Sequence, residues 1–231
     1  MMHQQTIFTR NGFYLGIGQT LPVAISGAAY GVVFGVLARQ AGLSWLETIL
    51  MSALVNAGGS QFVVLSMWFQ PLPTLTIILS TLIINLRHLL MGASLFPWIE
   101  KLSTGKIYSL AFFISDESWA LAMREFAEKR ADAAFLLGSG MTLYPVWVVS
   151  SVVGNLMSMA LHDPVQWGLD FAFTAVFTAL LVGMWKDKST LMPWLVSAVV
   201  ALIAFNWLPG KWYIILGGLA GSTVGGMRDG S

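Results

Sequence analysis

Long uncharged stretches alternate with short charged or proline-containing segments along this chain. Asp, Glu, Lys and Arg are absent from residues 11–38, 48–86, 133–162, 189–210 and 212–227. A helix that crosses a membrane needs about 20 consecutive, mostly apolar residues. The stretch 48–86 is too long for one such helix, and the prolines of Gln70-Pro71-Leu72-Pro73 divide it. The pattern therefore indicates several transmembrane helices.

The pattern predicts an all-α, polytopic integral membrane protein with about seven spans (six to eight) in a single transmembrane domain over 1–231. We expect the spans at about 13–38, 47–69, 74–97, 134–161, 167–185, 190–208 and 211–227. The segment 106–126 starts as apolar sequence but then contains Asp116 and Glu117. If this segment does not cross, most Lys and Arg residues fall on one side, as the positive-inside rule favours. We therefore expect a re-entrant or interfacial helix there, with an eighth span as the alternative.

A weak internal repeat accompanies these spans. A shift of 123 residues superposes Pro22 on Pro145, Gly31 on Gly154 and Glu47 on Asp170. With seven spans, the two three-helix units would have opposite orientations, which is the inverted-repeat plan of many secondary transporters. Apolar sequences also produce such matches by chance, so the repeat is a hypothesis.

Polar residues lie in the middle of the predicted span 47–69, in the sequence Asn56-Ala57-Gly58-Gly59-Ser60-Gln61. Adjacent glycines weaken a helix, and broken helices at the membrane midplane form the substrate and ion sites of many transporters. Close packing against another helix would explain the two glycines and Ser60. It does not explain the amides of Asn56 and Gln61. We therefore predict a broken helix and interpret these residues as a substrate site, with packing as the alternative.

A cationic residue lies near the middle of the predicted span 74–97. Arg87 is too deep there to reach the membrane surface with ease, and a charge at this depth needs a partner or a polar cavity. We interpret Arg87 and the nearby Asn85 as substrate-binding residues. The alternative is a structural ion pair with one of three carboxylates, Asp116, Glu117 or Asp170.

The same predicted span holds a candidate for proton coupling. Asn85, His88 and Gly92 share one helix face, at positions i, i+3 and i+7, which Arg87 does not share. Imidazole ordinarily changes charge near neutral pH, so His88 suits proton coupling. The carboxylates at 116–117, beside an apolar run, are further candidates. A histidine hydrogen-bonded within the protein and carboxylates that cap a helix are the alternatives.

Glycine ladders mark two of the predicted spans. They consist of Gly27, Gly31 and Gly35 in the first span and Gly217, Gly221 and Gly225 in the last. Small residues at intervals of four let helices approach closely. Each ladder would suit another helix of this chain or a helix of a partner protein.

The amino-acid composition is typical of a membrane protein and excludes most other classes of protein. Hydrophobic residues make up 56% and charged residues 10% of the chain, whereas soluble domains carry about 25% charged residues. The chain has no cysteine, which excludes disulfides, thiolate metal sites and cysteine nucleophiles. A net charge of +1 without a basic cluster argues against nucleic acid as a partner. No nucleotide-binding, zinc-protease or serine-hydrolase motif is present, so we expect no enzyme, cofactor or metal.

Five segments carry a resemblance to a known family. They are QTLPVAISGAAYGVVFG at 19–35, AGGSQF at 57–62, NLRHLLMGASL at 85–95, SDESWAL at 115–121 and GLDFAFTAVFTALL at 168–181. In this order and spacing they resemble the AzlC family of branched-chain amino acid permeases. The resemblance covers most of the chain. It implies the large subunit of a bacterial inner-membrane exporter, which works with a small AzlD-type membrane subunit.

The residue pattern and the resemblance together predict a secondary transporter that exports branched-chain or other small amino acids, coupled to protons. A zwitterion needs an anion-binding end and a cation-binding end in a mostly apolar pocket. We expect Arg87 or the backbone N–H groups of residues 58–60 to meet the carboxylate, and Asp116 or Glu117 to meet the ammonium group. A channel or facilitator for another small polar solute, and a membrane subunit without flux of its own, are the alternatives.

Overall fold

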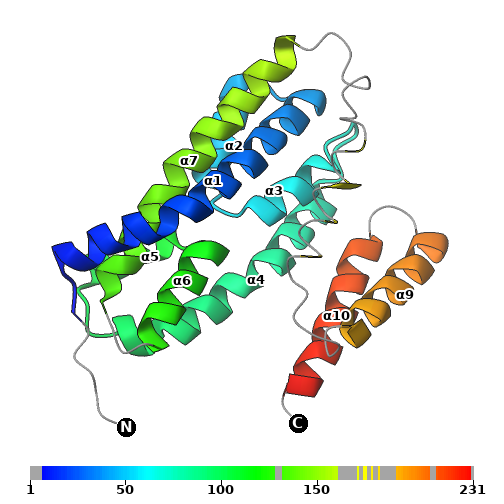
Figure 1. Cartoon of the computed structure of the whole chain (residues 1–231). Coiled ribbons are helices and arrows are strands. Elements are labelled where there is room, and N and C mark those ends of the chain that lie inside the picture. The colour runs from blue at the N-terminus through cyan, green and yellow to red at the C-terminus, as the bar shows by residue number, and fades with distance from the viewer. Residues whose placement is uncertain are drawn as a thin grey trace.

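The computed structural model describes residues 7–127, 132–160, 171, 174, 175, 178, 182, 191–208 and 212–229. Three helices in this part of the chain are long and apolar enough to cross a membrane, α1 (Arg10–Gln40), α4 (Thr74–Ile99) and α7 (Ala133–Ala160). The shorter helices are α2 (Trp45–Leu54), α3 (Gly58–Leu65), α5 (Thr104–Phe113), α6 (Asp116–Ala127), α9 (Leu191–Trp207) and α10 (Trp212–Asp229). The all-α prediction is confirmed for the described residues (Figure 1). The predicted span 167–185 lies almost wholly outside the described residues, and Asp170 lies outside them.

Helices α1 and α7 pack side by side and run in the same direction (Figure 1). At their N-terminal ends, Asp132 Oδ1 accepts hydrogen bonds from the backbone N–H groups of Thr9 (3.1 Å) and Ala134 (3.0 Å). Near their C-terminal ends, a Cβ added at Gly35 would lie 1.9 Å from the carbonyl oxygen of Ser151. The residue numbers of the contacting positions therefore increase in the same direction along both helices, so the two helices are parallel.

Small residues allow this close approach. A Cβ at Gly31 would lie 2.0 Å from Ser150 Oγ, and one at Gly154 would lie 2.0 Å from the carbonyl oxygen of Val32. Of the predicted ladder in the first span, Gly31 and Gly35 thus belong to the interface with α7. A Cβ at Gly27 would meet no described atom within 4 Å, so Gly27 does not belong to this interface.

The predicted span 47–69 forms two short helices, α2 and α3, with a break at 55–57 between them. Leu43, just before α2, and Leu65, at the end of α3, pack in one cluster with Leu37 near the C-terminal end of α1. The broken helix that the sequence predicted is therefore present. However, the chain returns to the end of the bundle where α2 began, whereas the sequence predicted a crossing.

The segment predicted as a re-entrant or interfacial helix also forms two short helices, α5 and α6. Near the start of α5, the Lys106 ammonium group lies 4.3 Å from the centre of the Phe8 ring, just before α1. The helix stops at 114–115, and α6 then runs back. Phe126, near the end of α6, stacks on Trp98 of α4 with ring centres 5.1 Å apart. The α5–α6 pair thus enters and leaves at the end of the bundle opposite to that of α2–α3.

Helix α4 joins the two ends of the bundle. Its residues Leu95 and Ile99 pack in one cluster with Phe135 and Leu136, which lie at the start of α7. Helix α4 therefore ends where α7 begins and runs antiparallel to α1 and α7.

The segments α1–α3 and α4–α6 follow one plan in opposite orientations. In each, a long helix precedes two short ones, and α2 and α5 both have 10 residues. Each of these begins directly after a Leu-Ser pair, Leu43-Ser44 or Leu102-Ser103. The inverted repeat predicted from the shift of 123 residues is wrong, since α1 and α7 are parallel. The physical reason is that 47–69 does not cross, so only one long helix separates them.

Helices α9 and α10 follow each other in the chain and pack side by side in antiparallel orientation, and α10 contacts α4 (Figure 1). A Cβ at Gly217 would lie 2.9 Å from Cβ of Ala201, and one at Gly221 would lie 2.9 Å from Cβ of Ser197. The predicted ladder in the last span is thus covered by α9 of this chain.

Candidate functional site

The two breaks meet in the middle of the bundle. The Asn56 side chain, in the break between α2 and α3, donates through Nδ2 to the carbonyl oxygens of Phe112 (3.1 Å) and Ile114 (3.4 Å). These carbonyl groups lie at the C-terminal end of α5, where the helical hydrogen-bond ladder ends and carbonyl oxygens need other partners. One amide therefore ties together the ends of two short helices that enter from opposite ends.

A cavity of about 710 Å³ lies beside this junction. Its polar side chains are Asn56, Thr81, Asn85 and His88. The rest of the lining is apolar and includes Leu54, Leu89, Leu95, Ile99, Ile107, Leu110, Phe112 and Leu136. The helix face that the sequence predicted for Asn85, His88 and Gly92 faces this cavity, because all three residues line it. The cavity is thus polar near the breaks and apolar toward the end of α4.

Two buried polar atoms of the lining residues have no hydrogen-bond partner among the described residues, Oδ1 of Asn85 and Oγ1 of Thr81. Buried polar atoms in folded proteins are nearly always hydrogen-bonded, so water or a ligand in the cavity would supply the partners of these two atoms. Thr81 was missed by the sequence analysis. It lies four residues before Asn85, and the face of Asn85 and His88 extends to it, so helical periodicity was the signal that pointed there.

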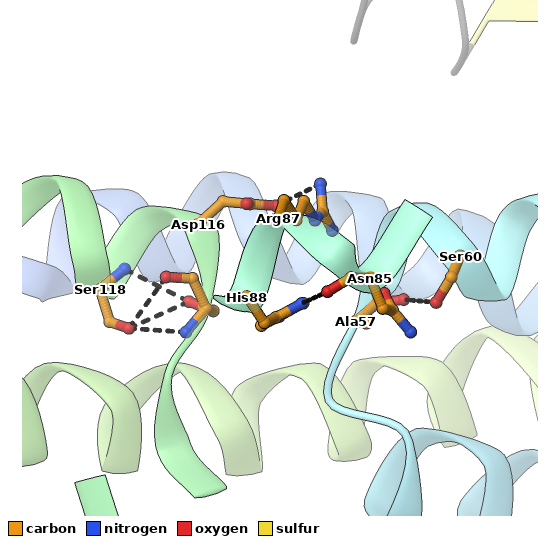
Figure 2. Close-up of polar contacts among 8 residues, drawn as sticks. Ala57, Ser60, Asn85, Arg87, His88, Asp116 and Ser118 are labelled. Carbon is orange, nitrogen blue, oxygen red and sulfur yellow. Dashed lines mark hydrogen bonds and ion pairs between the residues drawn. The ribbon is translucent and has the colours of Figure 1, made fainter. Parts of the chain in front are cut away.

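Arg87 lies on a different side of α4 and does not line the cavity. Its Nη1 atom forms an ion pair with Asp116 Oδ2 at 2.8 Å, and the two side chains are 34% and 43% exposed. Figure 2 shows this pair at one side of α4, with Asn85 and His88 at another. Of the three carboxylates that the sequence left open, the structure pairs Arg87 with Asp116, whereas Glu117 is exposed.

The guanidinium group also lies against the start of α3. A Cβ added at Gly59 would be 3.4 Å from Arg87 Nη2, so a glycine here leaves room for the arginine. Asp116 is the first residue of α6, where a carboxylate is favoured by the helix dipole. The ion pair therefore connects the middle of α4 to the second helix of one broken pair, beside the second helix of the other.

Three residues predicted to bind substrate are engaged in packing and internal hydrogen bonds. Gln61 is fully buried, and its Nε2 atom donates to the carbonyl oxygens of Met51 (2.9 Å) and Val55. Its Oε1 atom accepts from Trp147 Nε1 at 3.0 Å. The Met51 carbonyl also accepts the backbone N–H of Val55, whereas the Val55 carbonyl lies past the end of α2, where helical partners are missing. Gln61 therefore shapes the break.

The other two lie at the start of α3. Ser60 is fully buried, and its hydroxyl donates to the carbonyl oxygen of Ala57 at 2.9 Å (Figure 2). A Cβ at Gly58 would lie 3.0 Å from the Trp147 ring. Their side-chain positions are thus used within the fold, while the N-cap residue Ala57 provides no side-chain hydrogen bond to the start of α3.

The imidazole of His88 lies at the polar end of the cavity. Its Nδ1 atom is 3.3 Å from the carbonyl oxygen of Asn85 in the preceding turn (Figure 2). The described residues contain no group of three or more His, Cys, Asp and Glu side chains that could hold a metal ion. The chemistry available at this site is hydrogen bonding, helix-end electrostatics and one titratable ring.

The sequence profile of a known family, described as AzlC protein, matches residues 22–161. This is more than half of the chain, and it contains α4, both breaks and every candidate site residue. The chain belongs to the AzlC family. AzlC proteins are membrane transport proteins and not enzymes, and the described helices agree with a membrane location.

Several relatives of this AzlC chain are known by name. An uncharacterized membrane protein of Archaeoglobus fulgidus is 30% identical over 217 residues, which cover 93% of this chain and 94% of the relative. The inner membrane protein YgaZ of Escherichia coli is 28% identical, with 83% and 80% covered. The branched-chain amino acid transport protein AzlC of Bacillus subtilis is 26% identical, with 85% and 77% covered. No solved structure matches the chain at a significant level.

Proposed function

We propose that this chain is the large subunit of a two-component transporter that exports branched-chain or other small amino acids across the bacterial inner membrane. The cavity beside the meeting point of the two breaks is the observation that carries the proposal. It is polar at one end, apolar at the other, and contains two buried polar atoms without a partner among the described residues. These are the features that an aliphatic amino acid requires.

The ammonium group of the substrate would bind at the acceptors of the polar end. Oδ1 of Asn85 lacks a donor. The C-terminal ends of α2 and α5 reach the same cavity through Val55 and Ile114. Helix C-termini carry partial negative charge and favour cations. Together these groups suit a positive charge without a buried carboxylate.

The carboxylate would bind on the side of α3. Ala57 lines the cavity, and the first backbone N–H groups of α3 follow it directly. Helix N-termini favour anions. The aliphatic side chain of the substrate would then extend along α4 toward Leu95 and Ile99.

Proton coupling is assigned to His88. Of the three candidates from the sequence, His88 alone lines the cavity, whereas Asp116 is paired with Arg87 and Glu117 is exposed. An imidazole ring can take up and release a proton while a substrate binds next to it. Export direction and the small AzlD-type partner come from the family resemblance. The name of the Bacillus subtilis relative supports branched-chain amino acids as the substrate class.

Flux in proteoliposomes tests the proposal. The purified chain would be reconstituted with and without the small subunit, and labelled leucine uptake would be measured under an imposed proton gradient. We expect gradient-driven accumulation that requires both subunits and that stops when the gradient is dissipated. Leucine equilibration that ignores the gradient would indicate a facilitator, and no flux with both subunits would contradict a transport role.

A further inference from the structure

Gly92 lines the cavity but contributes no side chain to it. It lies on α4, one helical turn after His88 and one turn before Leu95 and Phe96, and all four residues line the cavity. A Cβ built at Gly92 would meet no atom within 4 Å in the described part of the chain. The glycine is thus not required for close packing, unlike Gly31 and Gly35 at the interface of α1 and α7.

The position of Gly92 lies between the two ends of the cavity. On one side are the polar groups of Asn85 and His88, and on the other are Leu95, Ile99 and Leu110. A ligand whose polar head binds at the first end must pass its side chain over Gly92 to reach the second. Any side chain at this position would therefore occupy the space that the ligand uses.

We propose that Gly92 sets the size of the aliphatic side chain that the cavity accepts. This inference rests on the proposed function, because it assumes an amino acid with its polar head near Asn85. With glycine the cavity admits a branched four-carbon side chain. A larger residue would project into the path between the polar groups and Leu95, so it would obstruct a long aliphatic side chain more than a methyl group.

Substitutions at Gly92 test this inference with a built-in control. Gly92→Ala and Gly92→Val add one and three carbons into open space. The control is Gly18→Val on α1, since a Cβ at the exposed Gly18 also meets nothing within 4 Å among the described residues and Gly18 does not line the cavity. Competing fluxes of labelled leucine and alanine would be measured in the same vesicles, together with membrane protein level.

We expect a graded change in selectivity. A hydrophobic pocket discriminates by roughly ten-fold or more per methylene, so Gly92→Val should lower the leucine-to-alanine flux ratio at least about ten-fold. Gly92→Ala should lower it by less, and Gly18→Val should leave it unchanged. The ratio is insensitive to the amount of inserted protein, so partial loss of expression does not affect the reading.

The outcomes separate this inference from the proposed function. If the unmodified chain and its partner carry no amino acid, the proposed function fails. If they carry leucine and both Gly92 variants keep the original ratio, or lose both fluxes equally, the assignment of Gly92 is overturned while the transport function stands.

Discussion

Asn56 joins the two breaks through a single amide, so its removal should uncouple them. The carbonyl groups of Phe112 and Ile114 would lose their donor. Each such hydrogen bond is worth about 0.5–1.5 kcal/mol net, which is too little to prevent insertion. We expect Asn56→Ala to reach the membrane at near-normal level but to lose at least about ten-fold in leucine flux. Normal flux at normal level would show that the junction is not required for transport.

Asn85 offers a test of the substrate's polar head. Its Oδ1 atom has no partner in the described residues, so Asn85→Ala should cost little stability. We expect a rise in the apparent KM for leucine with unchanged thermal stability. Asn155→Ala is the matched control, because the Oδ1 atom of Asn155 also has no partner among the described residues, but Asn155 does not line the cavity and donates to Thr48 Oγ1 at 2.8 Å. That variant should lose thermal stability, and equal behaviour of the two variants would argue against a ligand at Asn85.

The ion pair of Arg87 and Asp116 predicts a rescue. Arg87→Ala removes the partner of a carboxylate near the middle of the bundle, and an unpaired charge at membrane depth is costly, so the membrane level of the protein should fall. Adding Asp116→Asn removes the unpaired charge and should restore the level. Adding Glu117→Gln instead should not, since Glu117 is exposed and not paired with Arg87. Immunoblots of membranes would compare the variants, and rescue by Glu117→Gln would contradict the pairing.

At the residue scale, periodicity along one helix could be predicted but contacts between helices could not. Asn85, His88 and Gly92 were placed on one face because the rotation per residue of an α-helix is fixed. The partner of Arg87 stayed open because three carboxylates in other helices were equally compatible with the sequence. Gln61 was interpreted as a substrate residue because a buried amide needs partners, and the sequence does not show that Met51, Val55 and Trp147 supply them.

At the scale of elements, the interface of α1 and α7 depends on glycines that face backbone atoms. A Cβ at Gly35 would be 1.9 Å from a carbonyl oxygen of α7, and backbone cannot move aside as a flexible side chain can. Overpacking of this kind costs typically about 1–3 kcal/mol. We expect Gly35→Ala to lower the melting temperature in detergent by several degrees. Gly27→Ala, on the same helix but with open space, should leave it unchanged, and equal effects would contradict this interface.

Hydropathy predicts where the helices lie along the chain, but it does not predict the direction in which each helix runs. Apolar stretches of about 20 residues indicated where helices lie. The range 47–69 has the length of one span, so its composition is the same whether the chain crosses or returns. The return depends on the break at 55–57 and on the packing of Leu43 and Leu65 in one cluster. Hydropathy contains no information about such long-range packing.

At the scale of the whole molecule, the two inverted units predict which segments share a side of the membrane. Gln40 and Gln70 lie at the end of the bundle where α4 begins, and Ser103 lies at the other end. Since the chain has no cysteine, single-cysteine variants give an unambiguous reading. We expect Gln40→Cys and Gln70→Cys to react with an impermeant thiol reagent from one side, and Ser103→Cys from the other. A straight crossing of 47–69 would instead place Gln40 with Ser103.

The parallel packing of α1 against α7 has a consequence for biogenesis. The contacting residues lie more than a hundred positions apart, as with Gly35 and Ser151. At about 5–20 residues per second, the ribosome needs roughly 6 to 25 s to make the intervening chain. During that time the glycine face of α1 has no permanent neighbour from α7. A chaperone or the insertion machinery would hold it, and a nascent chain truncated before α7 would be a substrate for membrane proteases.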